Sequence, residues 1–265
     1  MLRDKKFYII GMGNIGKVLT QRLLAIGVPA DQIVISDTDA MRSADVTAKF
    51  GVKAFVDSEA SISEMDMMII ATPPNKVTEV LRSLDDKLRA GQVVISMAAA
   101  VPLEMLRSVV NEDVPVVRVL PNPPSMLGQG MNPVAYAANT PSGVKSLVEE
   151  FLGILGKTMV VRDDQMTWCV GLAGAAMRSV LPVIEGMMQA GIEAGLSPAD
   201  ARIVAAQIML GTATLALETD LSFEQIKSLT PMETVDEKLV ASLFLEAARA
   251  AKEKVDKSQA HLMGV

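Results

Sequence analysis

The 265-residue sequence is poor in the side chains that define several protein classes. It has one cysteine, Cys169, so no disulfide can form within the chain and a reducing compartment is expected. Its one histidine, His261, is expected to be solvated, and Cys169 is expected in the core. No His/Cys/Asp cluster has metal-ligand spacing, so no metal site is predicted. The net charge of −6 leaves no basic excess, which argues against a nucleic acid as partner.

Long hydrophobic runs are also scarce. The N-terminal apolar run is too short for a secretion signal and ends in a glycine loop, which predicts a first strand. The most apolar later stretch, WCVGLAGAAM, is cut off by Arg178 and falls short of the roughly 20 residues that span a bilayer. Hydrophobic residues nevertheless make up 50% of the chain, so a sizeable core is expected. We predict a soluble, cytoplasmic protein without a membrane partner.

Apolar β-type segments alternate with helical patterns in the first part of the chain. The segments are FYIIGM (7–12), QIVISD (32–37), DMMIIATPP (66–74), QVVISMAA (92–99), VPVVRVLPN (114–122) and TMVVRDD (158–164). This alternation predicts βαβ units and a parallel sheet, and the continuous apolar character predicts strands that are covered on both faces. We therefore predict an α/β fold, with a Rossmann-type parallel sheet domain over residues 1–162.

Strand signals stop after residue 162. Residues 165–195 predict one long helix that ends at Gly195, and residues 236–259 predict another helix. The segments 197–200 and 222–225 have the pattern of helix N-caps. We predict an all-helical domain over residues 163–265. Its first helix is too apolar to face water on any side, so a subunit interface is expected there.

The segment GMGNIG places Gly11, Gly13 and Gly16 in a G-x-G-x-x-G pattern between a predicted strand and a predicted helix. Gly11 permits the tight turn, Gly13 lets a pyrophosphate approach the backbone, and Gly16 lets helix and strand pack closely. A glycine turn that binds nothing is the alternative. The position of the pattern in the first βαβ unit favours a dinucleotide site.

The second predicted strand ends at Asp37, about twenty residues after the glycine loop, where an acid accepts hydrogen bonds from the adenosine ribose. A carboxylate there repels a 2′-phosphate, so NADH is slightly favoured over NADPH. Asp37 or Asp39 could instead cap the next helix, and Arg42, one turn on, could serve a phosphate.

Several further segments, in order along nearly the whole chain, resemble the pyrroline-5-carboxylate reductase family, which catalyses the last step of proline synthesis. These segments are GMGNI (11–15), ATPP (71–74), SMAAAV (96–101), RVLPNPP (118–124), EGMMQAGIEAGL (185–196) and QIMLG (207–211). The PNPP loop and the first helical segment are specific to the family, whereas the glycine loop alone is not.

The resemblance implies an NAD(P)H-dependent oxidoreductase that acts on a C=N bond, with residues 163–265 as a dimerisation and substrate domain. It implies a homodimer or a higher oligomer of dimers, and a small imine or keto carboxylate as substrate. The cofactor-binding residues that it implies, together with the glycine loop, are Gly11, Gly13, Asn14, Ile15, Gly16, Asp37, Ala71, Thr72, Pro74, Ala98 and Asn122.

The chain departs from the family pattern in three places. Pro73 replaces a lysine, GAAMRS (174–179) replaces G-S-G-P-A-Y, and TPMETV (230–235) replaces the substrate segment S-P-G-G-T-T. The resemblance makes Thr234 and Thr230 the catalytic candidates, and Arg178 and Glu233 the candidates for contact with the substrate.

Structural roles compete with these assignments. Thr230 could cap a helix that begins at TPME, with Glu233 as the acid of a capping box. Arg178 could hold a carboxylate, but a structural pair with Glu233 or Asp163 is favoured.

Three functions follow from the sequence. The leading one is reduction of pyrroline-5-carboxylate, in which case the altered substrate segment predicts weak turnover. The second keeps the fold and cofactor and uses a different imine or keto acid. The third is a dinucleotide-binding dimer that senses redox state without turnover.

Overall fold

The computed structural model describes residues 2–55, 62–230 and 232–264, which form two compact units. The first unit contains Met1–Gly174 and Arg249–Val265, and the second contains Ala175–Ala248. The predicted order, an α/β fold followed by a helical region, is confirmed. A domain boundary between residues 162 and 163 remains a prediction.

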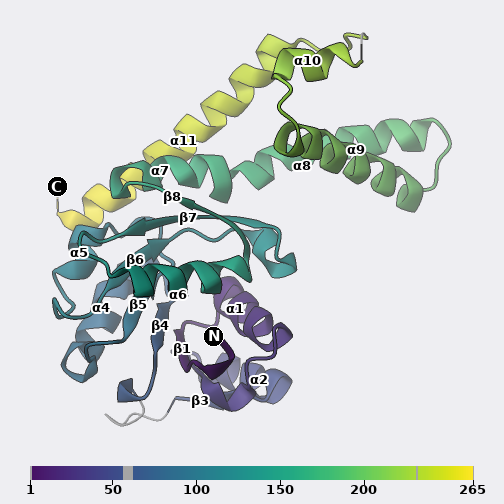
Figure 1. The fold of residues 1–265 in the computed structure, drawn as a ribbon. Helices are drawn as coiled ribbons and strands as arrows, with labels where there is room; N and C mark the ends of the chain where they lie inside the picture. Colours follow the sequence, from purple (N-terminus) through teal and green to yellow (C-terminus); the bar gives the residue numbers. More distant parts are fainter. Residues whose placement is uncertain (1, 56–61, 231, 265) are drawn as a thin grey trace. The chain divides into compact units, whose positions relative to one another are not determined.

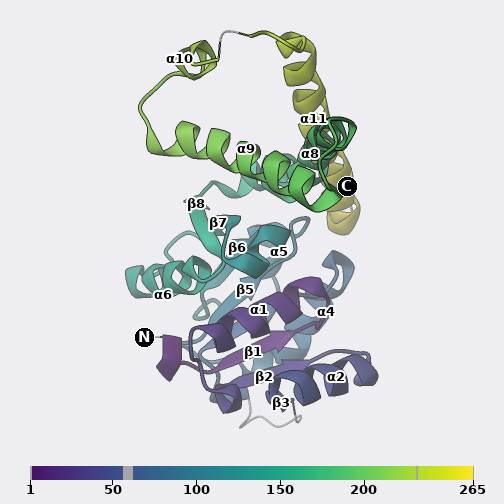
Figure 2. The same cartoon turned by 90° about the vertical axis from the view of Figure 1, so that its right-hand side faces the viewer.

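The first unit is built on one sheet. In the part of the chain that the structure describes, it has eight strands in the order β3-β2-β1-β4-β5-β6-β7-β8 (Figure 2). The strands are β1 (Phe7–Ile10), β2 (Ile33–Ser36), β3 (Lys53–Ala54), β4 (Met67–Ile70), β5 (Val93–Ser96), β6 (Val116–Val119), β7 (Gly130–Tyr136) and β8 (Gly156–Val160). Neighbours are parallel except β6 and β7. From β1 the chain builds outward through β2 to β3 and then crosses back to β4 on the other side of β1, which creates a switch point between β1 and β4.

Helices cover both faces of this sheet (Figure 1). On one face lie α1 (Asn14–Ala25), α2 (Ala40–Phe50) and α6 (Ser142–Gly153), and on the other lie α4 (Pro74–Leu84), α5 (Leu103–Arg107) and α7 (Met166–Cys169). Alternate residues of a strand pack into two hydrophobic cores, one on each face of the sheet. Phe7 and Ile9 of β1 join the first, whereas Tyr8 and Ile10 join the second. The continuous apolar character of the strands is therefore a consequence of burial on both faces.

Several elements of the first unit were not expected from the sequence, among them the short edge strand β3, the strand β7 and the helix α6. β7 contains Pro133, which has no N–H for a ladder and argues against a strand. The helix α6, whose Val148, Phe151 and Leu152 are fully buried, lies between β7 and β8. β7 adds a strand antiparallel to β6, and α6 then returns the chain so that β8 pairs parallel to β7.

The second unit contains α8 (Ala176–Glu193), α9 (Pro198–Glu218), α10 (Phe223–Ser228) and the start of α11 (Glu237–Met263). The predicted N-caps are confirmed, since the hydroxyl groups of Ser197 and Ser222 accept hydrogen bonds from the backbone N–H groups three residues on. α8 and α9 pack side by side (Figure 1). A Cβ atom on Gly191 would lie 3.0 Å from the Cβ of Ala201, so the small residues permit this close approach.

The helical stretch predicted over residues 165–195 is present as Asp163–Glu193, but it is not one regular α-helix. The segment is divided into α7, a π-helical turn η6 (Val170–Gly174) and α8. Gly171 and Gly174 lie in this turn, and glycine is unfavourable in a regular helix because it adds backbone freedom without side-chain contacts. The predicted stop at Gly195 is confirmed, with a positive φ of 92° at that residue.

Much of the apolar surface of the second unit is open. On α9, five apolar side chains are more than half exposed, namely Ile203, Val204, Ile208, Leu210 and Leu217. By length and composition alone, the stretches Asp163–Glu193 and Pro198–Glu218 could each cross a membrane, which corrects the expectation based on WCVGLAGAAM. Core helices of soluble proteins pass the same test, and helices covered by a second subunit have the same composition.

We therefore predict that the chain assembles through its helical unit. Light scattering at low micromolar concentration, without detergent, should give at least twice the mass of one chain. Ile208→Lys on α9 should lower that mass, because a charge would have to be buried in the interface. Met41→Lys, at a more exposed apolar position of α2, is the matched control and should leave the mass unchanged. A folded wild-type monomer would contradict the prediction.

Candidate functional site

The glycine loop joins β1 to α1 through contacts that leave no room for side chains. Gly11 has a φ of 100°, and a Cβ atom there would lie 2.7 Å from the carbonyl oxygen of Ala71. A Cβ atom on Gly16 would lie 2.0 Å from the carbonyl oxygen of Gly11. Gly13, the N-cap of α1, has nothing within 4 Å of its ideal Cβ position. Two of the glycines thus bring helix and strands together, and the third leaves an open cradle.

A cavity of about 910 Å³ lies beside this loop, at the carboxyl ends of β1, β2, β4 and β5. Eight of the predicted cofactor residues line it: Gly11, Gly13, Ile15, Asp37, Ala71, Thr72, Pro74 and Ala98. Asn14, Gly16 and Asn122 are not among the residues that line it. Asn14 begins α1, and Gly16 serves the close packing just described. The structure thus brings most of the predicted set to the switch point of the sheet.

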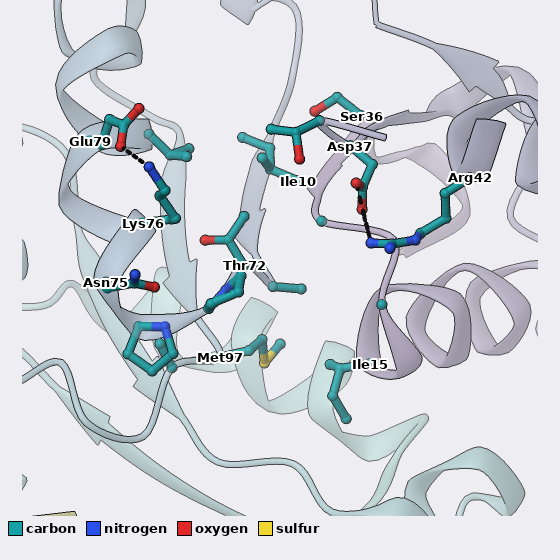
Figure 3. A pocket seen from close by; sticks show the side chains of 18 of the residues that line it. Ile10, Ile15, Ser36, Asp37, Arg42, Thr72, Asn75, Lys76, Glu79 and Met97 are labelled. Atoms are coloured by element: carbon teal, nitrogen blue, oxygen red, sulfur yellow. Dashed lines mark hydrogen bonds and ion pairs between the residues drawn. The ribbon is translucent and has the colours of Figure 1, made fainter. Parts of the chain in front are cut away.

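Asp37 lies on one side of the cavity, where its carboxylate is 6% exposed (Figure 3). Its Oδ2 accepts a hydrogen bond from the backbone N–H of Met12 (2.7 Å), and its Oδ1 accepts one from that of Asp39 (2.9 Å). The Arg42 guanidinium donates to both oxygens, at 3.1 and 3.3 Å. Burial raises the pKa of Asp37, but these hydrogen bonds and the Arg42 charge outweigh burial, so its pKa lies below the usual value.

The alternatives for this acidic pair are resolved by their contacts. Asp39 is the N-cap of α2, because its side chain accepts hydrogen bonds from the N–H groups of Met41 and Arg42. Asp37 instead links the glycine loop to the end of β2. Three donors already occupy the Asp37 carboxylate, and Arg42 neutralises its charge, so it repels a phosphate less than an isolated carboxylate would.

The opposite side of the cavity is formed by the turn after β4 and by α4 (Figure 3). Thr72 lies in this turn, and its hydroxyl oxygen is buried without a hydrogen-bond partner among the described residues. Lys76, one turn into α4, pairs with Glu79 at 2.8 Å. An unpaired buried hydroxyl is costly, so the Thr72 hydroxyl fits a polar ligand in the cavity.

Asn122 has a structural environment behind the cavity. It is 8% exposed, its amide nitrogen donates to the carbonyl oxygen of Ala173 in η6, and its amide oxygen accepts from the N–H of Met131 in β7. These bonds fasten the PNPP loop, which continues as η4 (Pro123–Leu127), to two other elements. Its predicted direct contact with a cofactor therefore stays a prediction.

The segment TPMETV does not begin a helix, which corrects the capping interpretation. Residues 232–236 are irregular, and α11 begins at Glu237 with Asp236 as its cap, because Asp236 Oδ1 accepts from the N–H of Leu239 at 3.0 Å. Pro231 lies outside the described residues. Thr230, Thr234 and Glu233 are exposed, so they form an open connection between α10 and α11.

The ends of this connection are joined by Lys227. Its ammonium group pairs with Glu224 at 2.8 Å and with Glu237 at 2.9 Å. Hydrogen bonds to Glu224 and Glu237 raise the pKa of Lys227 above its usual value. The segment and its flanking residues line a second hollow of about 350 Å³ in the helical unit.

The favoured pair of Arg178 with Glu233 does not form among the described residues, and Arg178 is exposed. Asp163 instead pairs with the buried Arg118 at 2.7 Å. Neither Arg118 nor Lys76 was singled out from the sequence. The isolated charge of Arg118 within the apolar strand VPVVRVL was the signal that could have identified it.

The geometry fits a dinucleotide at the cavity. An acid at the end of β2, an open glycine cradle at the N-terminus of α1, and an orphaned hydroxyl after β4 follow one another along its lining. Helix N-termini and glycine-loop amides bind pyrophosphate, and the acid position serves the ribose. These features and the exposed helical unit define a dinucleotide-dependent oxidoreductase of the Rossmann class.

Comparison with known proteins gives the family. Residues 163–258 match the family model for pyrroline-5-carboxylate reductase dimerisation, and residues 6–100 match the model for NADP oxidoreductase, coenzyme F420-dependent. The chain is 29% identical to the pyrroline-5-carboxylate reductase of Methanosarcina acetivorans (96% of this chain, 97% of that one) and 28% identical to that of Escherichia coli (96% and 98%). Together, the family-model matches and these relatives support a member of the pyrroline-5-carboxylate reductase family.

Solved structures show the same fold. A pyrroline-5-carboxylate reductase from Coxiella burnetii matches with a TM-score of 0.82 at 23% identity, covering 96% of this chain and 98% of that one. The Plasmodium falciparum pyrroline carboxylate reductase with NADP bound matches with a TM-score of 0.81 at 18% identity, covering 97% and 99%.

The open cradle at Gly13 gives a direct test of the cavity as a dinucleotide site. Gly13→Ala should leave the melting temperature unchanged, because the added methyl group meets no protein atom, yet it should weaken NADH binding at least tenfold by occupying the pyrophosphate position. Gly143→Ala in α6, which also has free space around it, is the matched control and should not change binding. Unchanged NADH affinity in Gly13→Ala would contradict the assignment.

Proposed function

We propose that the chain reduces the C=N bond of 1-pyrroline-5-carboxylate to give proline, with a reduced nicotinamide dinucleotide as cofactor. The cavity beside the glycine loop, in a chain of this family, is the observation that carries the proposal. When bound, the nicotinamide supplies a hydride. A cyclic imine is easily protonated by solvent, so the chain needs to position the reactants but does not need a strong acid. Steady-state NAD(P)H oxidation with 1-pyrroline-5-carboxylate tests the proposal.

The first unit supplies the groups that would hold the cofactor. The N–H groups at the start of α1 and the partial positive charge of the helix end suit the pyrophosphate. The Thr72 hydroxyl, which has no hydrogen-bond partner within residues 2–55, 62–230 and 232–264, is a donor and acceptor in the same lining. Asp37 has lone pairs left for a ribose hydroxyl, although the N–H groups of Met12 and Asp39 and the Arg42 guanidinium already use part of its capacity.

The same contacts set the proposed choice between NADH and NADPH. Asp37 favours NADH through its charge, whereas Arg42 offsets that charge and could turn to a 2′-phosphate because its side chain is 43% exposed. Asp39 holds Arg42 from the other side at 3.5 Å. With two carboxylates against one guanidinium, we propose a slight preference for NADH.

Two single changes should move this preference in opposite directions. Asp37→Ser removes the negative charge and should narrow the preference for NADH, and Arg42→Ala leaves both carboxylates uncompensated and should widen it. Each shift should be up to about fivefold, the range of a partly exposed charge pair. The measurement is kcat/KM with each cofactor, or Kd where turnover is absent. Arg82→Ala, at an exposed position of α4, is the control, and a wild-type preference for NADPH of tenfold or more would overturn the proposal.

For the substrate side we propose the exposed connection between α10 and α11, with Thr234 and Thr230 as hydroxyl groups that contact the imine. Arg178 and Glu233 remain the charged candidates. Arg178 is exposed and has no ion pair among the described residues, so its guanidinium is available for a carboxylate. Glu233 is exposed as well, and its charge disfavours a carboxylate ligand nearby.

The composition of this connection also supports a second candidate function, the reduction of another imine or keto acid. Met232 and Val235 are 75% and 64% exposed, so they stabilise no core and are free to contact a bulkier or more apolar substrate. A panel of imines and keto acids with the preferred cofactor separates this function from the first. Binding of NADH without turnover of any member would favour the third function, a redox-sensing dimer.

Restoring the glycine-rich segment tests the substrate assignment. The triple variant Met232→Gly, Glu233→Gly and Val235→Thr should raise kcat/KM for 1-pyrroline-5-carboxylate by about tenfold, because it adds a hydroxyl group and removes a like charge. The triple change breaks no capping box, because this segment is not helical, so no loss of stability is expected from it. The melting temperature should therefore stay within about 2 °C of the wild-type value.

Asp220→Gly, in the exposed connection between α9 and α10, is the control for added backbone freedom and should leave kcat/KM unchanged. The substrate assignment would be wrong if the wild type turned over this substrate efficiently and the triple change abolished turnover.

We further propose that the assembly is a homodimer, or a higher oligomer of dimers, in the cytoplasm. The exposed apolar residues of α9 and the match to a dimerisation family support this proposal.

A further inference from the structure

A fully buried arginine lies behind the cavity. Arg118 is on β6, and its side chain has no exposed surface. One terminal nitrogen donates to Asp163 Oδ1 at 2.7 Å and to the Asp163 carbonyl oxygen at 3.3 Å. The other terminal nitrogen donates to the carbonyl oxygen of Ala99. Burial lowers the pKa of Arg118, while Asp163 opposes that shift, and the guanidinium stays charged.

Asp163 extends this contact to a third element. Its Oδ2 accepts a hydrogen bond at 3.0 Å from the N–H of Leu103, the first residue of α5. Arg118 and Asp163 together therefore hold both ends of the segment 99–103, which connects β5 to α5. The backbone N–H of Leu103 and the carbonyl oxygen of Ala99 are the two attachment points.

One end of the held segment, Ala99, lies in a wall of the cavity. Met97 and Ala98, which join Ala99 to β5, line the same wall. Asp37 marks the adenosine end of a dinucleotide, and the glycine loop marks the pyrophosphate. The wall after β5 lies beyond the glycine loop, counted along the strand order from β2 through β1 and β4 to β5, and therefore belongs to the nicotinamide end.

We propose that Arg118 is a positioning residue for the nicotinamide half of the cofactor, because it fixes the Ala98–Ala99 wall from behind. The inference rests on the proposed dinucleotide function and assigns no direct contact with the cofactor. Arginine suits this position because its planar fork can serve the Ala99 carbonyl oxygen and the Asp163 carboxylate at the same time, whereas a lysine offers one point charge.

A buried ion pair costs desolvation free energy. The use of Arg118 and Asp163 to hold the loop therefore argues that the geometry of the loop matters. Burying a guanidinium requires a partner for its charge, and replacing a buried ion pair by apolar or neutral groups often leaves stability unchanged. If Arg118 only stabilised the fold, a neutral replacement of both partners would suffice. A fixed wall requires the donor to Ala99 itself, so position and stability can be separated by experiment.

The experiment compares NADH with ADP-ribose, which lacks the nicotinamide. Three variants are used: Arg118→Lys, Arg118→Met, and Arg118→Met combined with Asp163→Asn, in which the amide oxygen can still accept from Leu103 N–H. Binding of NADH is followed by its fluorescence and binding of ADP-ribose by calorimetry, and neither needs turnover. The double variant guards against unfolding caused by an unpaired Asp163.

We expect the Kd for NADH to rise about tenfold in the double variant, the scale of one hydrogen bond from a charged donor, while the Kd for ADP-ribose changes less than about twofold. Arg118→Lys should fall between this variant and the wild type. Arg22→Met is the matched control, because Arg22 also donates to a backbone carbonyl, that of Ile154 at 2.8 Å, away from the cavity. It should change neither Kd.

Equal weakening of both ligands, or no change in either, would overturn the positioning role and leave Arg118 a purely structural residue. A wild-type protein that binds neither ligand would refute the proposed dinucleotide function and this inference with it. NADH binding without turnover of 1-pyrroline-5-carboxylate would refute the reductase function only, and the comparison of the two ligands would still decide the role of Arg118.

Discussion

The close approach of three backbone segments at the glycine loop governs the rest of the first unit. Gly11 touches the carbonyl group of Ala71, and Gly16 touches that of Gly11, at distances that exclude any Cβ atom. These contacts bring the start of α1 against the ends of β1 and β4, where the strand order switches. Both the open cradle at Gly13 and the cavity follow from that geometry. Residues as distant in sequence as Asp37, Thr72 and Ala98 share one lining because they follow β2, β4 and β5, which are parallel and end at the same edge of the sheet.

Local patterns in the sequence predict those parts of the structure that depend on local physics. Apolar β-type segments give the strands β1, β2, β4, β5, β6 and β8, and the Ser197 and Ser222 caps give the starts of α9 and α10. The glycine pattern predicts the place of the cavity. The wrong predictions have non-local causes. Pro133 argued against a strand, but β7 pairs with strands on both of its sides. The TPME segment was expected to cap a helix at Thr230, but α11 is capped by Asp236, six residues later.

The residues of the candidate site also fall into two groups, those that local patterns identify and those that meet only in the folded chain. Residues set by the Rossmann pattern, such as Gly13 and Asp37, could be identified from spacing, because strand ends and helix starts fix where they lie. The partners of Asp37 could not, since the Met12 N–H and the Arg42 guanidinium meet it only after folding. Arg118 is the clearest case. Its partners lie 19 and 45 residues away, at Ala99 and Asp163, and no local pattern links them.

The helix α11 has a consequence for the order in which the chain can fold. Its first residues belong to the helical unit, whereas residues from Arg249 onward belong to the sheet unit, where Leu262 packs against the second core and Lys252 lies over the ring of Trp168. On the ribosome, residues 2–174 of that unit thus emerge before the segment from Arg249 onward that completes the unit. A nascent chain that stops short of Arg249 lacks Lys252, which lies over the Trp168 ring, and Leu262, which packs against the second core. Removal of Arg249–Val265 should destabilise the first unit rather than the helical unit that precedes these residues.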